Sequence, residues 1–132
     1  FTIRTSSSIY KTEDVYQELN PKTFFNQIVQ IETDLPYPEL ISEMKSIEST
    51  FGRKPDDKIV VPLDLDVLTY GKDVFSFQIK QLPDPNLVKY RYIAVPLSEM
   101  LPNFHHPASG KSIETILKEI DTQQKVKKID EV

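Results

Sequence analysis

Two aspartates spaced two residues apart are the clearest chemical feature of the sequence. Asp64 and Asp66 lie in the run LDLDVL at residues 63–68. In an extended strand, side chains at this spacing share one face, and their Cα atoms lie roughly 6.5 Å apart. Two neighbouring carboxylates repel each other unless a cation lies between them, and Mg²⁺ commonly binds one or two carboxylates together with substrate phosphates. The pair is therefore a candidate metal site with a role in catalysis.

Two other interpretations of this run stay open. Acids that alternate with aliphatic residues are also the ordinary pattern of a strand with one face in solvent. Alternatively, an aspartyl nucleophile followed two residues later by an acid occurs in phosphatases of the haloacid dehalogenase type. That motif has Thr or Val where Leu68 stands, which counts against the last interpretation.

Phe24 and Asn26 form a second candidate site, because a strand over residues 23–33 places both on one face. An aromatic plane beside an amide that both donates and accepts hydrogen bonds suits a flat heterocycle. An aromatic core residue and a strand asparagine bonded to a neighbouring loop would produce the same pattern.

Positive charge gathers just before the aspartates, at Arg53, Lys54 and Lys58. Binding of phosphate is one use of these cations, and complementing the dipole at the end of a helix is another. The adjacent His105 and His106 point apart and have no third ligand at a suitable spacing, so we interpret them as structural.

The composition excludes several classes of function. Sixteen Lys and Arg against twenty Asp and Glu give a formal net charge of −4, which does not suit a protein whose main partner is nucleic acid or an anionic membrane. With no cysteine there is no disulfide, thiolate metal site or thiol nucleophile. No run approaches about 18 apolar residues and no segment resembles a signal peptide, so we expect a soluble cytoplasmic protein.

Hydrophobic periodicity predicts an α+β fold, with a sheet covered by helices on one face. The clearest element is a helix over residues 39–52, where Leu40, Ile41, Met44, Ile47 and Phe51 make one apolar stripe and Gly52 ends the helix. We expect one domain over residues 1–124 and a charged, frayed tail over 125–132. The other predicted elements are strands over 1–10, 23–33, 59–70 and 74–79, a long loop over 11–22, one or two helical turns within 86–97 that end before Pro96, and a helix over 112–124 capped by Ser112.

Several motifs occur in an order that resembles one known family. The series SSIYKTE, FFNQIVQIET, ELISEMKSIESTFGR, PLDLDVLTYG, LPDP and YIAVPLSEMLPNF is similar to 6-hydroxymethyl-7,8-dihydropterin pyrophosphokinase over roughly residues 1–120. The resemblance implies a ferredoxin-like α/β sandwich with a mainly antiparallel sheet. It also implies a folate-pathway enzyme, a monomer, that transfers pyrophosphate from MgATP to the hydroxymethyl group of a pterin and releases AMP.

The resemblance assigns the pterin site to four residues. Phe24 and Tyr92 would sandwich the pterin ring, Asn26 would hydrogen-bond its edge, and the loop near Thr12 would close over it.

The same resemblance assigns the nucleotide site. Asp64 and Asp66 would hold two magnesium ions, and Arg53 would meet the ATP phosphates as a catalytic residue. Lys58 and Arg91 are candidate replacements for phosphate-binding side chains that the family has and this chain lacks.

The chain departs from the family pattern at several positions. It reads VVPL at residues 60–63 where family members carry Pro-Arg, LPDP at 82–85 where they carry a histidine, and Tyr90 where they carry arginine. The opening Gly-Ser-Asn strand and first helix of the family are not in the sequence. Two alternatives therefore stay open: a catalytically impaired relative that acts as a nucleotide-, pterin- or protein-binding module, and an unrelated ferredoxin-like structural domain.

Overall fold

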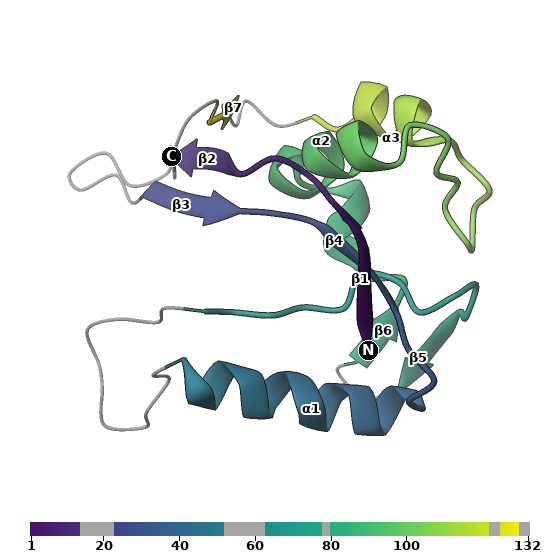
Figure 1. Cartoon of the computed structure of the whole chain (residues 1–132). Helices are drawn as coiled ribbons and strands as arrows, with labels where there is room; N and C mark the ends of the chain where they lie inside the picture. Colours follow the sequence, from purple (N-terminus) through teal and green to yellow (C-terminus); the bar gives the residue numbers. More distant parts are fainter. Residues whose placement is uncertain (14–22, 52–62, 78–79, 122–124, 130–132) are drawn as a thin grey trace.

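Groups of strands are separated by helices along the chain (Figure 1). The computed structural model describes residues 1–13, 23–51, 63–77, 80–121 and 125–129. Its strands pair antiparallel and are accompanied by helices, so the predicted α+β class is confirmed. The elements are β1 (Thr2–Ser6), β2 (Tyr10–Glu13), β3 (Thr23–Asn26), β4 (Val29–Glu32), α1 (Tyr37–Thr50), β5 (Phe75–Phe77), β6 (Lys80–Leu82), the 3₁₀ helix η1 (Pro85–Val88), α2 (Arg91–Met100), α3 (Ile113–Glu119) and β7 (Val126–Lys128).

The described strands form three separate ladders, β1–β4, β3–β2–β7 and β5–β6, where the sequence predicted one sheet. Ser7 produces one of the breaks. Its N–H donates to the Ile28 carbonyl at 2.8 Å, its Oγ accepts from the Ile28 N–H at 2.9 Å, and its carbonyl accepts from Gln27 Nε2 at 2.8 Å. A serine hydroxyl can replace ladder bonds in this way. The strand predicted over residues 23–33 is therefore divided into β3 and β4, and the strand predicted over 1–10 ends at Ser6. The long loop predicted over 11–22 is wrong for residues 11–13, which belong to β2, and residues 14–22 lie outside the described ranges.

β7 pairs with the outer edge of β2, although its residues belong to the segment that the sequence predicts to be frayed. Lys128 Nζ forms an ion pair with Glu99 on α2 at 2.9 Å, and the Ile129 N–H donates to the Ile9 carbonyl at 2.9 Å. The expectation of fraying is therefore wrong for residues 126–129, because partners distant in sequence order them.

Residues 63–70 run extended beside α1 (Figure 1), but they belong to no ladder in the described part of the chain. Their backbone finds other partners. The Leu65 N–H donates to the Glu48 carboxylate on α1, and the Leu68 carbonyl accepts from the Asp84 N–H at 2.8 Å. The predicted strand over 59–70 is therefore wrong for residues 63–70, and residues 59–62 lie outside the described ranges.

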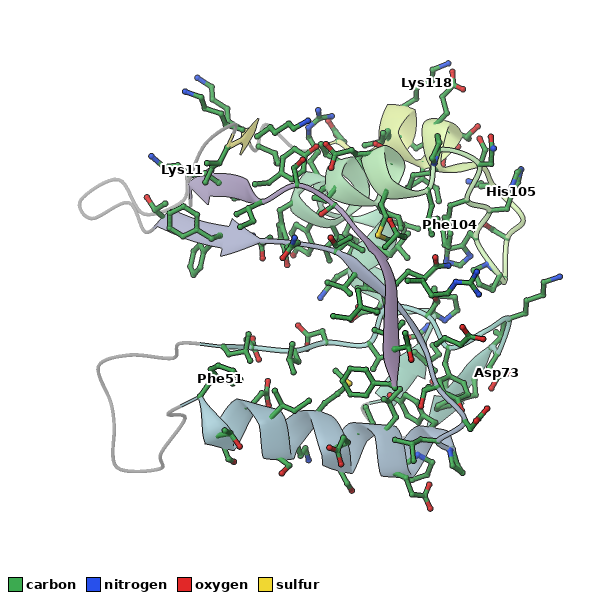
Figure 2. All side chains as sticks on the ribbon, in the orientation of Figure 1. Lys11, Phe51, Asp73, Phe104, His105 and Lys118 are labelled. Carbon is green, nitrogen blue, oxygen red and sulfur yellow. The ribbon has the colours of Figure 1, made fainter. Side chains whose placement is uncertain are left out.

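α1 buries a narrow face made by Leu40 and Glu48. The helix ends at Thr50, so Phe51 lies past its last turn and is 61% exposed (Figure 2). The prediction that Phe51 belongs to the buried stripe is wrong, and the predicted terminator Gly52 lies outside the described residues.

The main apolar cluster joins η1, α2 and α3. Ser112 caps α3 as predicted, because its Oγ accepts from the Thr115 N–H at 3.1 Å, but α3 ends at Glu119 rather than continuing to residue 124. The buried members of the cluster are Leu87, Ile93, Ala94, Leu97, Ile113 and Ile116.

α2 continues through Pro96, which the sequence predicts to be its end. A proline at this position removes the hydrogen bond that its nitrogen would have donated to the Tyr92 carbonyl. The Pro96 ring is fully buried, and its neighbours Ile93, Ala94 and Leu97 on α2 belong to the core, so burial of the ring offsets the missing bond. The expectation of one or two turns before Pro96 is therefore wrong.

Within the described residues, no helix is both long enough and apolar enough to cross a lipid bilayer.

Candidate functional site

A groove of about 440 Å³ opens between α1, the extended segment 63–67 and residues 81–86. It contains both aspartates that the sequence singled out. The described residues that line it are Tyr37, Ile41, Met44, Lys45, Glu48, Asp64, Leu65, Asp66, Val67, Gln81, Asp84, Pro85 and Asn86.

Asp64 and Asp66 are exposed, whereas Leu63, Leu65 and Val67 between and beside them are half-buried. The alternation expected of an extended chain is therefore present, although no strand ladder supports it. Among the described residues, no three His, Cys, Asp or Glu side chains come close enough to hold a metal ion by themselves. A cation in this groove would therefore need oxygen ligands from a bound phosphate or from water.

Glu48 fixes the backbone between the two aspartates. Its side chain is on the buried face of α1, with the residue 8% exposed, and its Oε2 accepts from the Leu65 N–H at 2.6 Å. Glu48 was not among the predicted site residues. Its position in the sequence could have indicated a role, because Glu48 follows Leu40 and Met44 at four-residue intervals and is therefore a charged residue on the apolar stripe.

Asp84 is a further acid on the wall of the groove. Its carboxylate caps η1, because Oδ1 accepts from the Asn86 N–H at 2.9 Å. One oxygen of the Asp84 carboxylate is therefore directed at the backbone of η1. The negative charge of Asp84 also reaches Tyr37: burial raises the pKa of the Tyr37 hydroxyl, and Asp84 raises it further.

Lys45 is the positively charged side chain among the described residues that line the groove. It lies on the exposed side of α1, one turn before Ser49. No sequence pattern singles out Lys45, because charged and polar residues alternate on the exposed side of any solvent-facing helix. Of the predicted phosphate contacts, Arg53 and Lys58 lie outside the described residues, and Arg91 is half-buried at the first position of α2.

The predicted pterin residues of the hairpin share one face of the β2–β3 ladder. Thr12 lies directly opposite Phe24, and Tyr10 lies opposite Asn26, and opposed residues of antiparallel strands project to the same side. Phe24 is 48% exposed, and Thr12 is 2% exposed, with no hydrogen-bond partner for its Oγ1 in the part of the chain that the structure describes. A buried hydroxyl without a partner is costly, which makes this face suited to a ligand that hydrogen-bonds.

Tyr92 is not in ring contact with Phe24 among the described residues. Its ring stacks on Tyr90, with centroids 5.3 Å apart and planes at 27°, and it packs against the α2–α3 core. Burial raises the pKa of the Tyr92 hydroxyl, and Tyr90, Asp66 and Asp84 raise it further through their charges. Tyr92 thus stands within electrostatic range of the acidic groove.

Glu99 on α2 connects three elements around the start of β2. Its carboxylate accepts from the Ser8 N–H at 2.6 Å and from the Ser8 Oγ at 3.0 Å, and it pairs with Lys128. The Ser8 backbone bond and Lys128, with smaller contributions from the hydroxyls of Ser8 and Tyr10, lower the pKa of Glu99 to about 2.

The histidines, which the sequence predicts to be structural, bond to their own loop. His106 Nδ1 accepts from the backbone N–H groups of two residues of that loop.

The fold and the site together define an α+β domain with a carboxylate-bearing groove and a strand face that presents an aromatic ring, an amide and a free hydroxyl. Residues 1–102 match the family model of 7,8-dihydro-6-hydroxymethylpterin-pyrophosphokinase, and the chain belongs to this family. The resemblance seen in the motifs is thereby confirmed.

Several curated proteins are similar to the chain. A 2-amino-4-hydroxy-6-hydroxymethyldihydropteridine pyrophosphokinase from Synechocystis is 31% identical over 99 residues, which are 74% of this chain and 51% of that protein. The protein of the same name from Aquifex aeolicus is 30% identical over 112 residues, covering 84% of this chain and 69% of that protein. The folic acid synthesis protein fol1 of Pneumocystis carinii is 28% identical over 116 residues, covering 87% of this chain and 16% of that protein. The chain thus spans from about a sixth to about two thirds of the length of these relatives.

Proposed function

We propose that the chain transfers pyrophosphate from MgATP to the hydroxymethyl group of 6-hydroxymethyl-7,8-dihydropterin in folate synthesis, with release of AMP. The observation that carries the proposal is the placement of Asp64 and Asp66, which are both exposed and line one groove. Membership of the pyrophosphokinase family and the names of the curated relatives support it.

In the proposed reaction, the pterin hydroxymethyl oxygen attacks the β-phosphorus of ATP. The bond from that phosphorus to the oxygen bridging to the α-phosphate breaks, AMP leaves with the bridging oxygen, and the hydroxyl proton is released. Transfers of this kind depend on alignment and on neutralisation of charge more than on a covalent nucleophile. The side chains of the groove and of the strand face supply these two requirements.

Magnesium fits the donor set of the groove. Two exposed carboxylates, with no third His, Cys, Asp or Glu of the described residues close enough to share a metal ion, match the usual mode of Mg²⁺, which completes its shell with phosphate oxygens and water. Asp64 and Asp66 would hold the metal, and we propose two ions, which would neutralise charge on the phosphate oxygens. Lys45, Arg53, Lys58 and Arg91 are the proposed phosphate contacts of the protein itself.

The pterin is proposed to lie against the β2–β3 face. Phe24 offers an exposed ring for stacking, Asn26 offers a donor and an acceptor, and Thr12 offers a buried hydroxyl that lacks a partner. Tyr92 would complete the stack from α2 by leaving Tyr90. We also propose that the chain acts as a monomer in the cytoplasm, with which its lack of cysteine is compatible.

The direct test mixes the 132-residue chain with ATP, Mg²⁺ and the hydroxymethyl-dihydropterin, and follows AMP by chromatography and the pyrophosphorylated pterin by mass spectrometry. AMP release that requires both the pterin and Mg²⁺ is the expected result. Binding of both ligands without AMP would instead favour a catalytically impaired binding module. Failure to bind either ligand would reject the assignment of the site.

A further inference from the structure

We propose that Glu48 is a positioning residue that holds the Asp64–Leu65–Asp66 backbone so that both aspartates face the groove. The proposal rests on the function proposed above, because it concerns the metal and nucleotide side of that site. Glu48 itself is assigned no contact with the nucleotide or the metal.

The first support is the geometry of the bond. The Glu48 carboxylate reaches from the buried face of α1 to the Leu65 N–H at 2.6 Å. Leu65 stands between the two aspartates, and its side chain is half-buried. In an extended chain the backbone N–H groups project roughly at right angles to the side chains, and successive side chains alternate. A bond that fixes the direction of the Leu65 N–H therefore also fixes the common side on which Asp64 and Asp66 project.

The second support is the lack of a ladder. In a sheet, backbone bonds on both sides would set the orientation of every residue, but residues 63–70 pair with no strand in the described part of the chain. Three of the bonds that hold the segment join Glu48 to the Leu65 N–H, the Asp84 N–H to the Leu68 carbonyl, and the Tyr70 hydroxyl to the Leu35 carbonyl. Of these three, the Glu48 bond is the one that lies between the aspartates.

The third support is the strength expected of this contact. A bond from a backbone N–H to a buried carboxylate is charge-assisted and shorter than a neutral one. Removing the acceptor leaves the Leu65 N–H without this partner in a partly buried place, where loss of a bond is costly. Without this bond, we expect the segment to rotate or to detach from α1.

The test compares Glu48→Met, which removes the acceptor, with Glu48→Gln, which keeps a neutral acceptor, and with Glu43→Gln on the exposed side of α1 as the matched control. Hydrogen exchange of the Leu65 amide reports the bond itself. Calorimetry measures two affinities separately: that for a non-hydrolysable ATP analogue with Mg²⁺, and that for the pterin. Mn²⁺ with the same analogue, followed by electron paramagnetic resonance, gives a second measure of metal binding.

In Glu48→Met we expect faster Leu65 exchange and about tenfold weaker binding of the metal–nucleotide complex, equivalent to about 1.4 kcal/mol, with pterin affinity within about twofold of the parent. In Glu48→Gln we expect a smaller change in the same direction in both measurements, and in Glu43→Gln none. Equal losses of nucleotide and pterin binding in Glu48→Met would show a merely structural role and overturn the proposal. In Glu48→Gln, faster Leu65 exchange with metal–nucleotide affinity equal to the parent's, or weaker metal–nucleotide binding with unchanged Leu65 exchange, would overturn it as well, and this comparison decides where Glu48→Met does not fold.

These readouts separate the proposal from the proposed reaction. If the parent chain releases no AMP but the Glu48 variants show the expected exchange and metal–nucleotide affinities, the reaction is wrong and the positioning role stands. If the parent releases AMP and the Glu48 variants bind the metal–nucleotide complex like the parent, the reaction stands and the positioning role is wrong.

Discussion

Glu99 on α2 accepts two hydrogen bonds from Ser8, one from the backbone N–H at 2.6 Å and one from Oγ at 3.0 Å. The two residues are 91 positions apart, and Ser8 lies two residues before β2, the strand that carries Thr12. Lys128 on β7 pairs with the same carboxylate. One acid of α2 therefore anchors both the start and the outer neighbour of the strand proposed to face the pterin.

Glu99 makes the stability of the chain depend on acid pH. Because its folded pKa of about 2 lies below the ordinary value of 4.5, its contribution is present above pH 4.5 and is lost as pH falls toward 2. We expect Glu99→Gln to lower the free energy of unfolding at pH 7 by about 1–2 kcal/mol, after allowance for solvent screening. Urea unfolding between pH 7 and 2 should show a smaller fall for Glu99→Gln than for the parent, and parallel curves would contradict the assignment.

Asp64 and Asp66 should be required for AMP release, whereas other exposed acids should not. We expect Asp64→Asn and Asp66→Asn each to lower AMP release by about 10²-fold or more, the usual scale for loss of electrostatic stabilisation of a transition state. The Mg²⁺ concentration needed for half-maximal activity should rise in both variants. Asp73→Asn is the control, because Asp73 lies in the exposed turn before β5 (Figure 2). Normal activity in either groove variant would show that its carboxylate holds no essential metal.

Local patterns in the sequence predicted much of the site. The two-residue spacing of Asp64 and Asp66 places them on one side of any extended chain, whether or not a ladder forms. The Ser112 cap is likewise local, because its partner is three residues away. The common face of Phe24 and Asn26 follows from alternation within one short strand.

The parts that the sequence could not predict depend on contacts between distant residues. The bend at Ser7 requires Ile28, β7 requires β2, and the continuation of α2 through Pro96 requires a core built with α3. Propensity and periodicity describe a segment without its tertiary partners, so they favour long straight strands and an early end at Pro96. Glu48 combines a local and a distant feature. Its place on the apolar stripe of α1 can be read from the sequence, but its partner Leu65 is 17 residues away and cannot be predicted from local patterns.

Lys45 should contribute to nucleotide binding rather than to pterin binding. It brings positive charge to a groove that also contains Asp64, Asp66 and Asp84, so its loss should weaken the attraction for phosphates. We expect Lys45→Met to raise the KM for ATP by about 3- to 10-fold with little change in the KM for the pterin. Lys118→Met on α3, whose side chain projects away from α1 (Figure 2), should leave both values unchanged. An equal effect of the two substitutions would point to overall charge rather than to the groove.

His106 should make its loop sensitive to mild acid. Its Nδ1 accepts from the Ala108 and Ser109 N–H groups at 3.2 and 3.1 Å, so the ring must be neutral to hold them. Burial, and then the charge of Lys111, lower its pKa below 6.5; this stabilisation is therefore present above pH 6.5 and is lost as pH falls through the lowered pKa. The protection factors of the Ala108 and Ser109 amides, which correct for the slower intrinsic exchange at lower pH, should fall from pH 7 to 5.

Two substitutions check the His106 assignment. His106→Asn offers a side-chain oxygen as an acceptor that does not titrate in this range, so the fall in protection between pH 7 and 5 should disappear. His105 is the control, because its Nδ1 lies 2.9 Å from the Asn103 carbonyl, to which it can only donate, and protonation preserves that bond. A loss of the pH effect in His105→Asn rather than in His106→Asn would reverse the assignment.

Phe24 and Phe25 offer a paired test of the pterin face, because they are adjacent on β3 and project to opposite sides of the ladder. Both are exposed, at 48% and 64%, so replacing either by Ala creates no buried cavity and should leave stability almost unchanged. We expect Phe24→Ala to weaken pterin binding by about 1–3 kcal/mol, the scale of an aromatic ring stacked on a base, and Phe25→Ala to have little effect. Calorimetric titration of the pterin measures both, and a greater loss in Phe25→Ala would place the pterin on the other side of the hairpin.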